Sequence, residues 1–516
     1  MKKLTALIIV FTVLFGLVLW AGGDKEKPGE AAAEGKYGGS LVYGHPRNIY
    51  SFDPLALPGG NRPIYHIFYN TLVAYDSEGN LVPELATEWE FGDDGLSMTF
   101  ELREGVKFHN GREMVADDVV FSLERAQDKA VAANIRPLAL SVTEAEAVDD
   151  TTVVFRFDAP NPAVFDLLDL LFIQNKDTID SIKNKPAGTG PFMLKEWIPG
   201  TRAHAVKFED YWNKDEEGNP LPYLDEIIIK PFPDAQAMVV NLEAGAADLI
   251  QEPTFNDLAR LEATGKYTTF LGTPSVFKDV LLNVTKPPMD NQKVRQAIQY
   301  AIDREKFVET YFKGFSKATC VPVPDFHMAY DPAFEDMYTF DLDKAKQLLA
   351  EAGYPDGFEV ECLTAFKVVG GSEILAQIMQ ADLAKIGVRM KIVDNESAVI
   401  RPKWFQGEYV MSLHNYGRAA KDPASLFGTA VVWHPETGIT QYRGEKYADL
   451  IEQGVSTLDP EKRKEIYQEV VRIALEESFT IAVATEARPF AMQKYVKDVS
   501  YSLDNFLDLE KTWLDK

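Results

Sequence analysis

The residues able to do acid, base or metal chemistry are scattered along the chain. Asp117-Asp118 and Asp149-Asp150 are pairs of neighbouring acids, which a helix start and a solvated turn explain. There is no GxSxG nucleophile elbow and no HExxH zinc motif. The seven histidines form no spaced pair on one helix: His45, His66, His109, His204, His327, His414 and His434. We therefore expect no catalytic residue, no metal site and no cofactor.

Two other kinds of site have weaker support. A glycoside hydrolase needs two carboxylates about 5–10 Å apart in a cleft. The sequence alone does not give the distance between two carboxylates. A secreted glycoside hydrolase is therefore kept as a remote alternative. The glycine-rich stretch Pro186–Phe192 is not followed by Lys-Ser/Thr or by a helix start. We interpret it as a tight turn before a strand rather than a phosphate loop.

The two cysteines, Cys320 and Cys362, have no metal-site or redox spacing. Cys362 alternates with Glu359 and Glu361 in the segment Phe358–Leu363, which predicts a thiol on the buried face of a strand. A disulfide between the two cysteines is an alternative in an oxidising compartment.

The composition indicates a water-soluble globular protein with more than one core. The chain has 516 residues, of which 46% are hydrophobic and 26% charged. Its formal net charge is -26. A nucleic-acid-binding surface needs a basic stripe, so nucleic acid is not expected as a partner.

The N-terminus has the order of a secretory signal peptide. Met1-Lys2-Lys3 is basic, Leu4–Trp20 is almost entirely apolar, and Ala21-Gly22-Gly23 is small. We expect residues 1–21 to be the signal peptide, with a retained anchor as the alternative. No cysteine follows the apolar run, which excludes the usual lipoprotein site. Residues 22–36, charged and rich in alanine and glycine, are expected to be a disordered linker.

Hydrophobic periodicity divides the rest of the chain into two α/β bodies. Val280–Val284 predicts a buried strand, Pro287-Pro288 a break, and Val294–Ile302 an amphipathic helix capped by Asp290. Beyond it, Ser372–Ile386 predicts a helix between two strands, which is typical of a lobe with a largely parallel sheet. The break between the bodies is predicted near Asn283.

Five stretches in this order resemble one family, the bacterial extracellular solute-binding proteins of family 5, which are peptide and nickel receptors of ABC importers. The resemblance covers about residues 39–516, and the stretches are Phe108–Gly111 with Ala116–Ser122, Gly188–Phe192, Tyr211-Trp212 with Pro222–Asp225, Pro288 with Val294–Ala297 and Ala301–Arg304, and Ala345 with Leu348–Tyr354. Each stretch alone is a weak signal. Their order behind a signal peptide is specific.

The resemblance implies an α/β, two-lobed periplasmic-binding-protein fold of type II. Lobe I would comprise residues 37–282 and 486–516, with an extra subdomain at about 79–180, and lobe II would comprise 283–485. Two interlobe crossings would serve as hinges, one near Asn283 and one near Ala484–Pro489, with Asn283 and Ala484 as the candidate hinge residues. It further implies a periplasmic or extracellular monomer that passes a small solute to the membrane subunits of an ABC permease.

The same resemblance draws attention to Asn415–Phe427. In the peptide receptors, an aspartate a few residues before the Asp-Pro pair binds the α-amino group of the ligand. Here Asp422-Pro423 is present, and Asp422 is a candidate ligand-binding residue, but the earlier position corresponds to Ala419. The amine anchor is therefore absent, which puts ordinary free-amine peptides in doubt. Arg418 is a candidate partner for a ligand carboxylate, with a surface ion pair as the alternative.

Some family members bind oligosaccharides by stacking sugar rings on aromatic side chains. Lobe II offers Trp404, Tyr416, Trp433 and Tyr442 for stacking, with Asn395 and Asn415 as hydrogen-bonding partners. For each ring, burial in the core is the competing interpretation, and Trp433 is the one we expect to be exposed. The main hypothesis is a peptide-type receptor, and the alternative is an oligosaccharide receptor of the same family.

Overall fold

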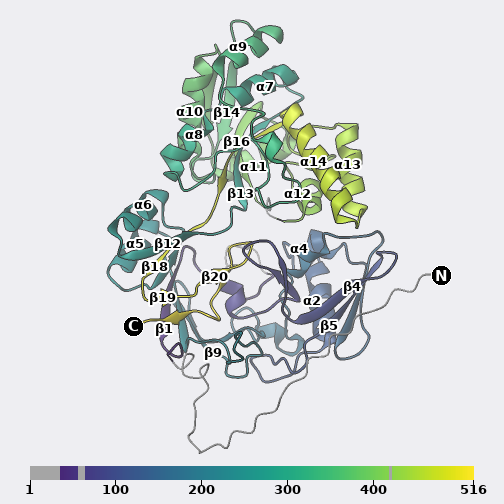
Figure 1. Ribbon diagram of the computed structural model, residues 1–516, viewed down its shortest axis with the longest axis vertical. Helices are drawn as coiled ribbons and strands as arrows, with labels where there is room; N and C mark the ends of the chain where they lie inside the picture. The colour runs from purple at the N-terminus through teal and green to yellow at the C-terminus, as the bar shows by residue number, and fades with distance from the viewer. Residues whose placement is uncertain (1–34, 56–63, 418–420) are drawn as a thin grey trace, which may run out of the picture.

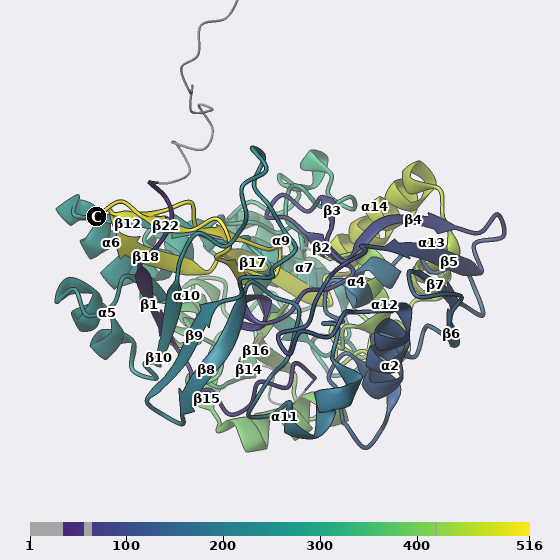
Figure 2. The same ribbon diagram turned by 90° about the horizontal axis from the view of Figure 1, so that it is seen from below.

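Two lobes joined by two crossing segments form the structure, a computed structural model that describes residues 35–55, 64–417 and 421–516 (Figures 1 and 2). The expected signal peptide and all but the last two residues of the expected linker lie outside the described residues. Within the described ranges, no helix is both long and apolar enough to cross a bilayer.

Lobe I is built on a seven-stranded sheet with strands from both ends of the chain. In spatial order the strands are β12 (Tyr267–Leu271), β18 (Pro489–Gln493), β11 (Leu249–Gln251), β1 (Ser40–His45), β10 (Glu226–Pro231), β9 (Arg202–Lys207) and β8 (Phe192–Ile198). β1 pairs in parallel with β10 and β11, and the other pairings are antiparallel. The C-terminal strand β18 fills the place between β12 and β11, so lobe I is discontinuous in sequence.

Two helices, α5 (Ala235–Glu243) and α6 (Phe255–Thr264), flank this sheet near the crossings (Figure 1). Their ends follow from local chemistry. The Asp234 carboxylate accepts a hydrogen bond from the backbone of the first turn of α5, and Thr254 caps α6 in the same way. α6 ends at Gly265, which has a φ of 62°.

A smaller antiparallel sheet lies within residues 79–180, the range expected for the subdomain. Its order is β4 (Ala86–Phe91), β5 (Ser97–Leu102), β7 (Thr152–Arg156) and β6 (Glu144–Ala147). Met98, Phe100, Val153 and Phe155 are fully buried and alternate with more exposed residues, as period-2 patterning requires. The accompanying helices are α2 (Ala116–Gln127), α3 (Arg136–Ala139), α4 (Val164–Leu168) and η2 (Lys176–Ser181).

Three two-stranded sheets complete lobe I. They are β2 (Val73–Tyr75) with β3 (Leu81–Pro83), β19 (Val496–Lys497) with β22 (Trp513–Leu514), and β20 (Ser500–Tyr501) with β21 (Leu507–Asp508).

Lobe II is built on a five-stranded sheet. Its order is β15 (Arg389–Asp394), β14 (Glu359–Thr364), β16 (Met411–Tyr416), β13 (Val276–Leu282) and β17 (Thr480–Glu486). β14 is parallel to β15 and β16, whereas β13 is antiparallel to both of its neighbours. Apolar clusters cover both faces: Val280 and Leu282 of β13 join one cluster, and Phe277 and Leu281 join the other.

The lobe II helices are α7 (Gln292–Tyr300), α8 (Arg304–Phe307), η3 (Val308–Phe312), η4 (Pro332–Phe334), α9 (Leu342–Glu351), α10 (Ser372–Ala384), α11 (Ser397–Gln406), α12 (Pro423–Thr429), α13 (Glu445–Ser456) and α14 (Pro460–Glu477). The predicted helix after Pro287-Pro288 is α7. Its capping side chain is that of Asn291, which accepts a hydrogen bond from the Lys293 amide, so the prediction of Asp290 as the cap is wrong.

The crossings lie at residues 272–275, between β12 and β13, and at Ala487-Arg488, between β17 and β18. The prediction of Asn283 as a hinge is wrong, because β13 already belongs to the lobe II sheet. Asn283 is fully buried, and its amide donates to the Gly407 carbonyl within lobe II. The second crossing lies within the predicted range Ala484–Pro489, but Ala484 itself is inside β17 and the bend falls three residues later.

Both cysteines are buried free thiols, so a disulfide is not formed. Cys362 lies in β14 with no exposed surface, as its alternation with glutamates predicted. Burial raises the pKa of the Cys362 thiol to about 12, which keeps it protonated and unreactive.

Candidate functional site

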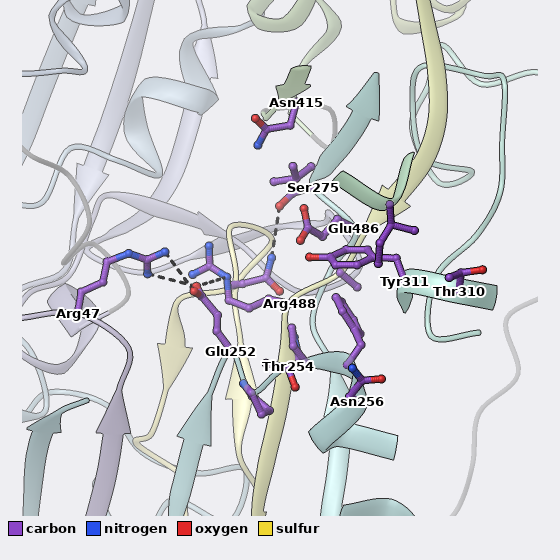
Figure 3. A pocket seen from close by; sticks show the side chains of 17 residues that line it. Arg47, Glu252, Thr254, Asn256, Ser275, Thr310, Tyr311, Asn415, Glu486 and Arg488 are labelled. Atoms are coloured by element: carbon purple, nitrogen blue, oxygen red, sulfur yellow. Dashed lines mark hydrogen bonds and ion pairs between the residues drawn. The ribbon is translucent and has the colours of Figure 1, made fainter. Parts of the chain in front are cut away.

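A cavity of about 530 Å³ lies between the lobes, beside the two crossings (Figure 3). Lobe I contributes residues that follow β1 and β11, and lobe II contributes η3 and the end of β16. The crossings themselves supply Ser275 and Arg488. The polar residues in its wall are Arg47, Glu252, Thr254, Asn256, Ser275, Thr310, Tyr311, Asn415, Glu486, Arg488 and Asn505.

On the lobe I side, two guanidinium groups converge on one carboxylate (Figure 3). Arg47 donates two hydrogen bonds to Glu252, at 3.2 and 3.1 Å, a bidentate pair. Arg488 contacts the same carboxylate through Nε at 3.4 Å. Glu252 has a φ of 60°, and its amide donates to the Pro489 carbonyl, so the backbone holds this acid beside the first residue of β18.

On the lobe II side, Lys278 and Glu486 form an ion pair between β13 and β17. The Nζ–Oε2 distance is 2.6 Å, and the Lys278 side chain is only 3% exposed. The carboxylate of Glu486 lies in the cavity wall beside Tyr311 (Figure 3). Burial raises the pKa of Tyr311, so its hydroxyl stays protonated and can donate a hydrogen bond.

Away from the crossings the lobes touch again, where α12 faces α4 (Figure 1). The Lys421 ammonium of lobe II forms ion pairs with Asp169 and, at 3.1 Å, with Asp504 of lobe I, and lies over the Tyr75 ring. The amide of Asp422 also donates to the Asp166 carboxylate, at 3.2 Å. Direct contacts between the lobes therefore exist at both sides of the interface.

Of the residues that the sequence singled out, Asn415 lies in the cavity wall. Asp422 instead caps α12 and forms a two-bond ion pair with Arg463, at 2.9 and 2.6 Å. Asn395 donates to the Val393 carbonyl at 2.8 Å in the turn after β15. Arg418 and Ala419 lie outside the described residues.

The aromatic candidates are largely engaged by the lobe II core. The expectation that Trp433 is exposed is wrong: the residue is 2% exposed and packs edge-on against the rings of Tyr416, Phe427 and Phe479. A flanking His-Pro pair marks a loop, but it does not show which way a large ring points.

Three further rings have partners inside lobe II. Tyr416 is buried and donates its hydroxyl to the Pro322 carbonyl at 2.7 Å. Trp404 is buried and donates to Ser412 at 2.8 Å. Tyr442 is half-buried and stacks on Phe479 with ring centroids 4.6 Å apart. Core packing therefore accounts for all three.

The sequence did not single out Arg47, Glu252, Arg488 or Lys421. Arg47 and Glu252 come just after the ends of β1 and β11, which are parallel neighbours, so both side chains lie at one edge of the sheet. The pairing of strands about 200 residues apart is not visible locally. Arg488 falls inside the predicted second crossing, and that position was the only available signal.

A second cavity, of about 410 Å³, lies inside lobe I and holds two acids, Glu84 and Glu510. Burial raises their pKa values to about 7 and about 8. Glu84 accepts hydrogen bonds from Thr71, and Glu510 from Tyr211 and Asn213. Every residue in this wall belongs to lobe I, so these acids do not flank the interlobe cavity as a glycosidase pair would.

No group of three or more histidine, cysteine, aspartate or glutamate side chains is placed to hold a metal ion in the part of the chain that the structure describes.

Comparisons with known proteins agree with the two-lobed architecture. The chain is 30% identical over 452 residues to heme-binding protein A of Haemophilus influenzae, covering 81% of each chain. It is 28% identical over 466 residues to the dipeptide-binding protein of Escherichia coli, covering 83% of this chain and 85% of the relative.

Among solved structures, the periplasmic binding protein DppA from Helicobacter pylori in complex with the peptide STSA superposes with a TM-score of 0.76 at 27% identity. That match covers 94% of this chain and 100% of the other. The expected two-lobed fold is thereby confirmed. The model of the bacterial extracellular solute-binding proteins, family 5, matches residues 80–433, most of the chain. This chain therefore belongs to the bacterial extracellular solute-binding proteins of family 5.

Proposed function

We propose that this protein is an extracytoplasmic receptor that captures a small peptide-type solute and delivers it to an ABC permease. The observation that carries the proposal is the cavity of about 530 Å³ whose polar wall comes from both lobes and both crossings. Such a cavity can enclose a short peptide and offers it fixed hydrogen-bonding and charged groups. Relatives named as a dipeptide-binding protein and as a peptide complex support the same ligand class.

Binding and closure are linked by the position of the cavity. A solute that contacts Arg47 in lobe I and Asn415 in lobe II makes its full set of contacts only when the lobes are together. Its differential affinity then shifts the population toward the closed form. The crossings at 272–275 and 487–488 are the segments about which the lobes would rotate.

The oligosaccharide alternative has less support. Sugar recognition would need exposed rings, whereas Trp404, Tyr416 and Trp433 are buried and Tyr442 stacks on Phe479. No observation favours a glycoside hydrolase, because Glu84 and Glu510 share a cavity inside one lobe. We propose a monomeric binding protein without enzymatic activity, exported by its N-terminal segment.

The decisive experiment is a thermal-shift and calorimetric screen of the purified protein. The ligand arms are di- to tetrapeptides, β-linked oligosaccharides, heme and nickel chelates. A true ligand at about 100 times its Kd should stabilise the protein by about 2.7 kcal/mol. We expect the peptide arm to do so.

A matched pair of variants locates the site. Asn415→Ala removes an amide from the cavity wall, and Asn184→Ala removes an exposed amide from lobe I. Peptide affinity should fall only in the first variant. Stabilisation by oligosaccharides alone, or by none of the arms, would refute the peptide proposal.

A further inference from the structure

Arg488 has fewer polar contacts than the other charged residues of the interlobe cavity. Its contact with Glu252 is a single one, through Nε at 3.4 Å. Among the described residues its guanidinium donates no hydrogen bond, and its side chain is 26% exposed. Its two terminal nitrogens, four N–H donors in a planar fork, are therefore available to a ligand.

The charges around the cavity leave Arg488 as a cation in excess. Glu252 already has a bidentate partner in Arg47, and Glu486 has the buried Lys278. The described wall contains no other acid. A ligand that brings one negative charge to Arg488 would neutralise the excess positive charge of the cavity, whereas a cationic ligand group would be repelled there.

Neutral hydrogen-bonding groups surround the same place. The Asn505 amide group donates to the Thr273 carbonyl at 3.0 Å, but its buried Oδ1 has no hydrogen-bond partner in the described part of the chain. Ser275 lies within 3.4 Å of the same amide nitrogen. Asn415 faces this region from the lobe II side (Figure 3). Ser275 and Asn415 can accept from and donate to a polar ligand end without adding charge, whereas Asn505 acts by holding the first crossing in place.

We infer that Arg488 is a carboxylate-binding residue, and that the protein selects solutes with a free carboxylate, such as the C-terminus of a short peptide. The guanidinium fork matches a carboxylate in bidentate geometry. One uncompensated cation matches a monoanionic carboxylate better than a doubly charged phosphate. The inference rests on the proposed function, because it assigns one end of the ligand within the same cavity.

The position of Arg488 also places the carboxylate contact at the crossings between the lobes. The residue is half of the second crossing, and its carbonyl accepts a hydrogen bond at 2.8 Å from the amide of Gly272 in the first crossing. A carboxylate on Arg488 therefore binds where the two connections between the lobes meet.

The test compares an equimolar tripeptide library with the same library amidated at the C-terminus, using calorimetry and thermal shift. We expect the wild type to bind the free acids roughly tenfold to a hundredfold more tightly, as loss of a charge-assisted hydrogen bond implies. Arg488→Met should lose this preference and bind both libraries with similar, weak affinity. Arg488→Lys should keep part of it, since the charge remains but the fork is lost.

Arg156→Met is the matched control, because Arg156 is exposed and pairs with Glu144 and Glu146 in the antiparallel subdomain. It should retain the full acid preference. Equal binding of acids and amides by the wild type, or an unchanged preference in Arg488→Met, would overturn the inference while leaving peptide binding intact. If neither library binds, the peptide proposal itself fails and the assignment of Arg488 fails with it.

Discussion

Asp422 and Asp166 are neighbouring acids at the interface between the lobes, and their partners differ. Asp422 has a full ion pair with Arg463, whose side chain is 4% exposed. Asp166 is 1% exposed and accepts hydrogen bonds from Tyr75 and from the Asp422 amide, but within the described residues it has no lysine or arginine in ion-pair contact. Burial, opposed by Lys421 and reinforced by Asp422, raises the pKa of Asp166 to about 7. Desolvation without a dedicated cation therefore makes this acid a proton acceptor near neutral pH.

Asp166→Asn should reduce the pH dependence of folding. Asp166 binds its proton more tightly when folded than when unfolded, so its contribution to the free energy of unfolding is full below pH about 4 and is lost as pH rises to about 7. Urea denaturation between pH 4 and 8 should show the variant losing less stability than the wild type, by about 4 kcal/mol. Asp180→Asn, at an exposed position, is the control. Identical slopes in Asp166→Asn and wild type would contradict the argument.

Elements that depend on local patterns were predicted well from the sequence. The helix predicted over 372–386 is α10 (Ser372–Ala384), and the alternation at 388–392 is β15 (Arg389–Asp394). The first crossing was misplaced, because the apolar run Val280–Val284 predicts a buried strand without showing which lobe's sheet the strand joins. The residues of the interlobe cavity were harder to predict than the crossings. Trp433 points into the core, and Arg47 meets Glu252, because of contacts between segments far apart in the chain.

At the scale of elements, the crossings are two adjacent segments held together by backbone and side-chain contacts. The amide of Gly272 donates to the Arg488 carbonyl at 2.8 Å, and Asn505 holds the Thr273 carbonyl from the C-terminal segment. A Cβ at Gly272 would lie 1.7 Å from the Asn505 oxygen. A glycine is therefore required for this close approach.

Gly272→Ala should displace the first crossing and destabilise lobe I. The expected cost is about 1–3 kcal/mol, that of overpacking a well-packed site, and it is measured as a lower midpoint in urea denaturation. Asn505 has a φ of 61°, which glycine adopts without strain. The double variant Gly272→Ala/Asn505→Gly removes the clashing oxygen and should recover part of the loss. No difference in stability between Gly272→Ala and wild type would show that the contact is unimportant.

At the scale of the whole molecule, two sets of contacts hold the two lobes together. The crossings form one, and the other is Lys421, 3% exposed, which reaches from lobe II to Asp169 and Asp504 of lobe I. Because this second contact is not covalent, its free energy sets how readily the lobes separate when no solute is bound.

Lys421→Met should favour separation of the lobes. Removing the ammonium leaves Asp169 and Asp504 facing lobe II without their cation, which opposes contact. Small-angle scattering of the unliganded variant should give a larger radius of gyration than the wild type, and its ligand affinity should fall severalfold. Lys446→Met, at an ion pair with Glu469 inside lobe II, is the control. An unchanged radius together with unchanged affinity would show that Lys421 does not fasten the lobes.

The place of β18 between β12 and β11 also governs the order in which a newly made chain can fold. Lobe II runs without interruption from β13 to β17, so its strands can assemble as soon as they emerge from the ribosome or the translocation channel. Lobe I must wait for residues 489–493, although most of its strands are made first. Until then β11 and β12 lack the strand that lies between them, which leaves an interval in which export machinery and chaperones can act on an incomplete lobe I sheet.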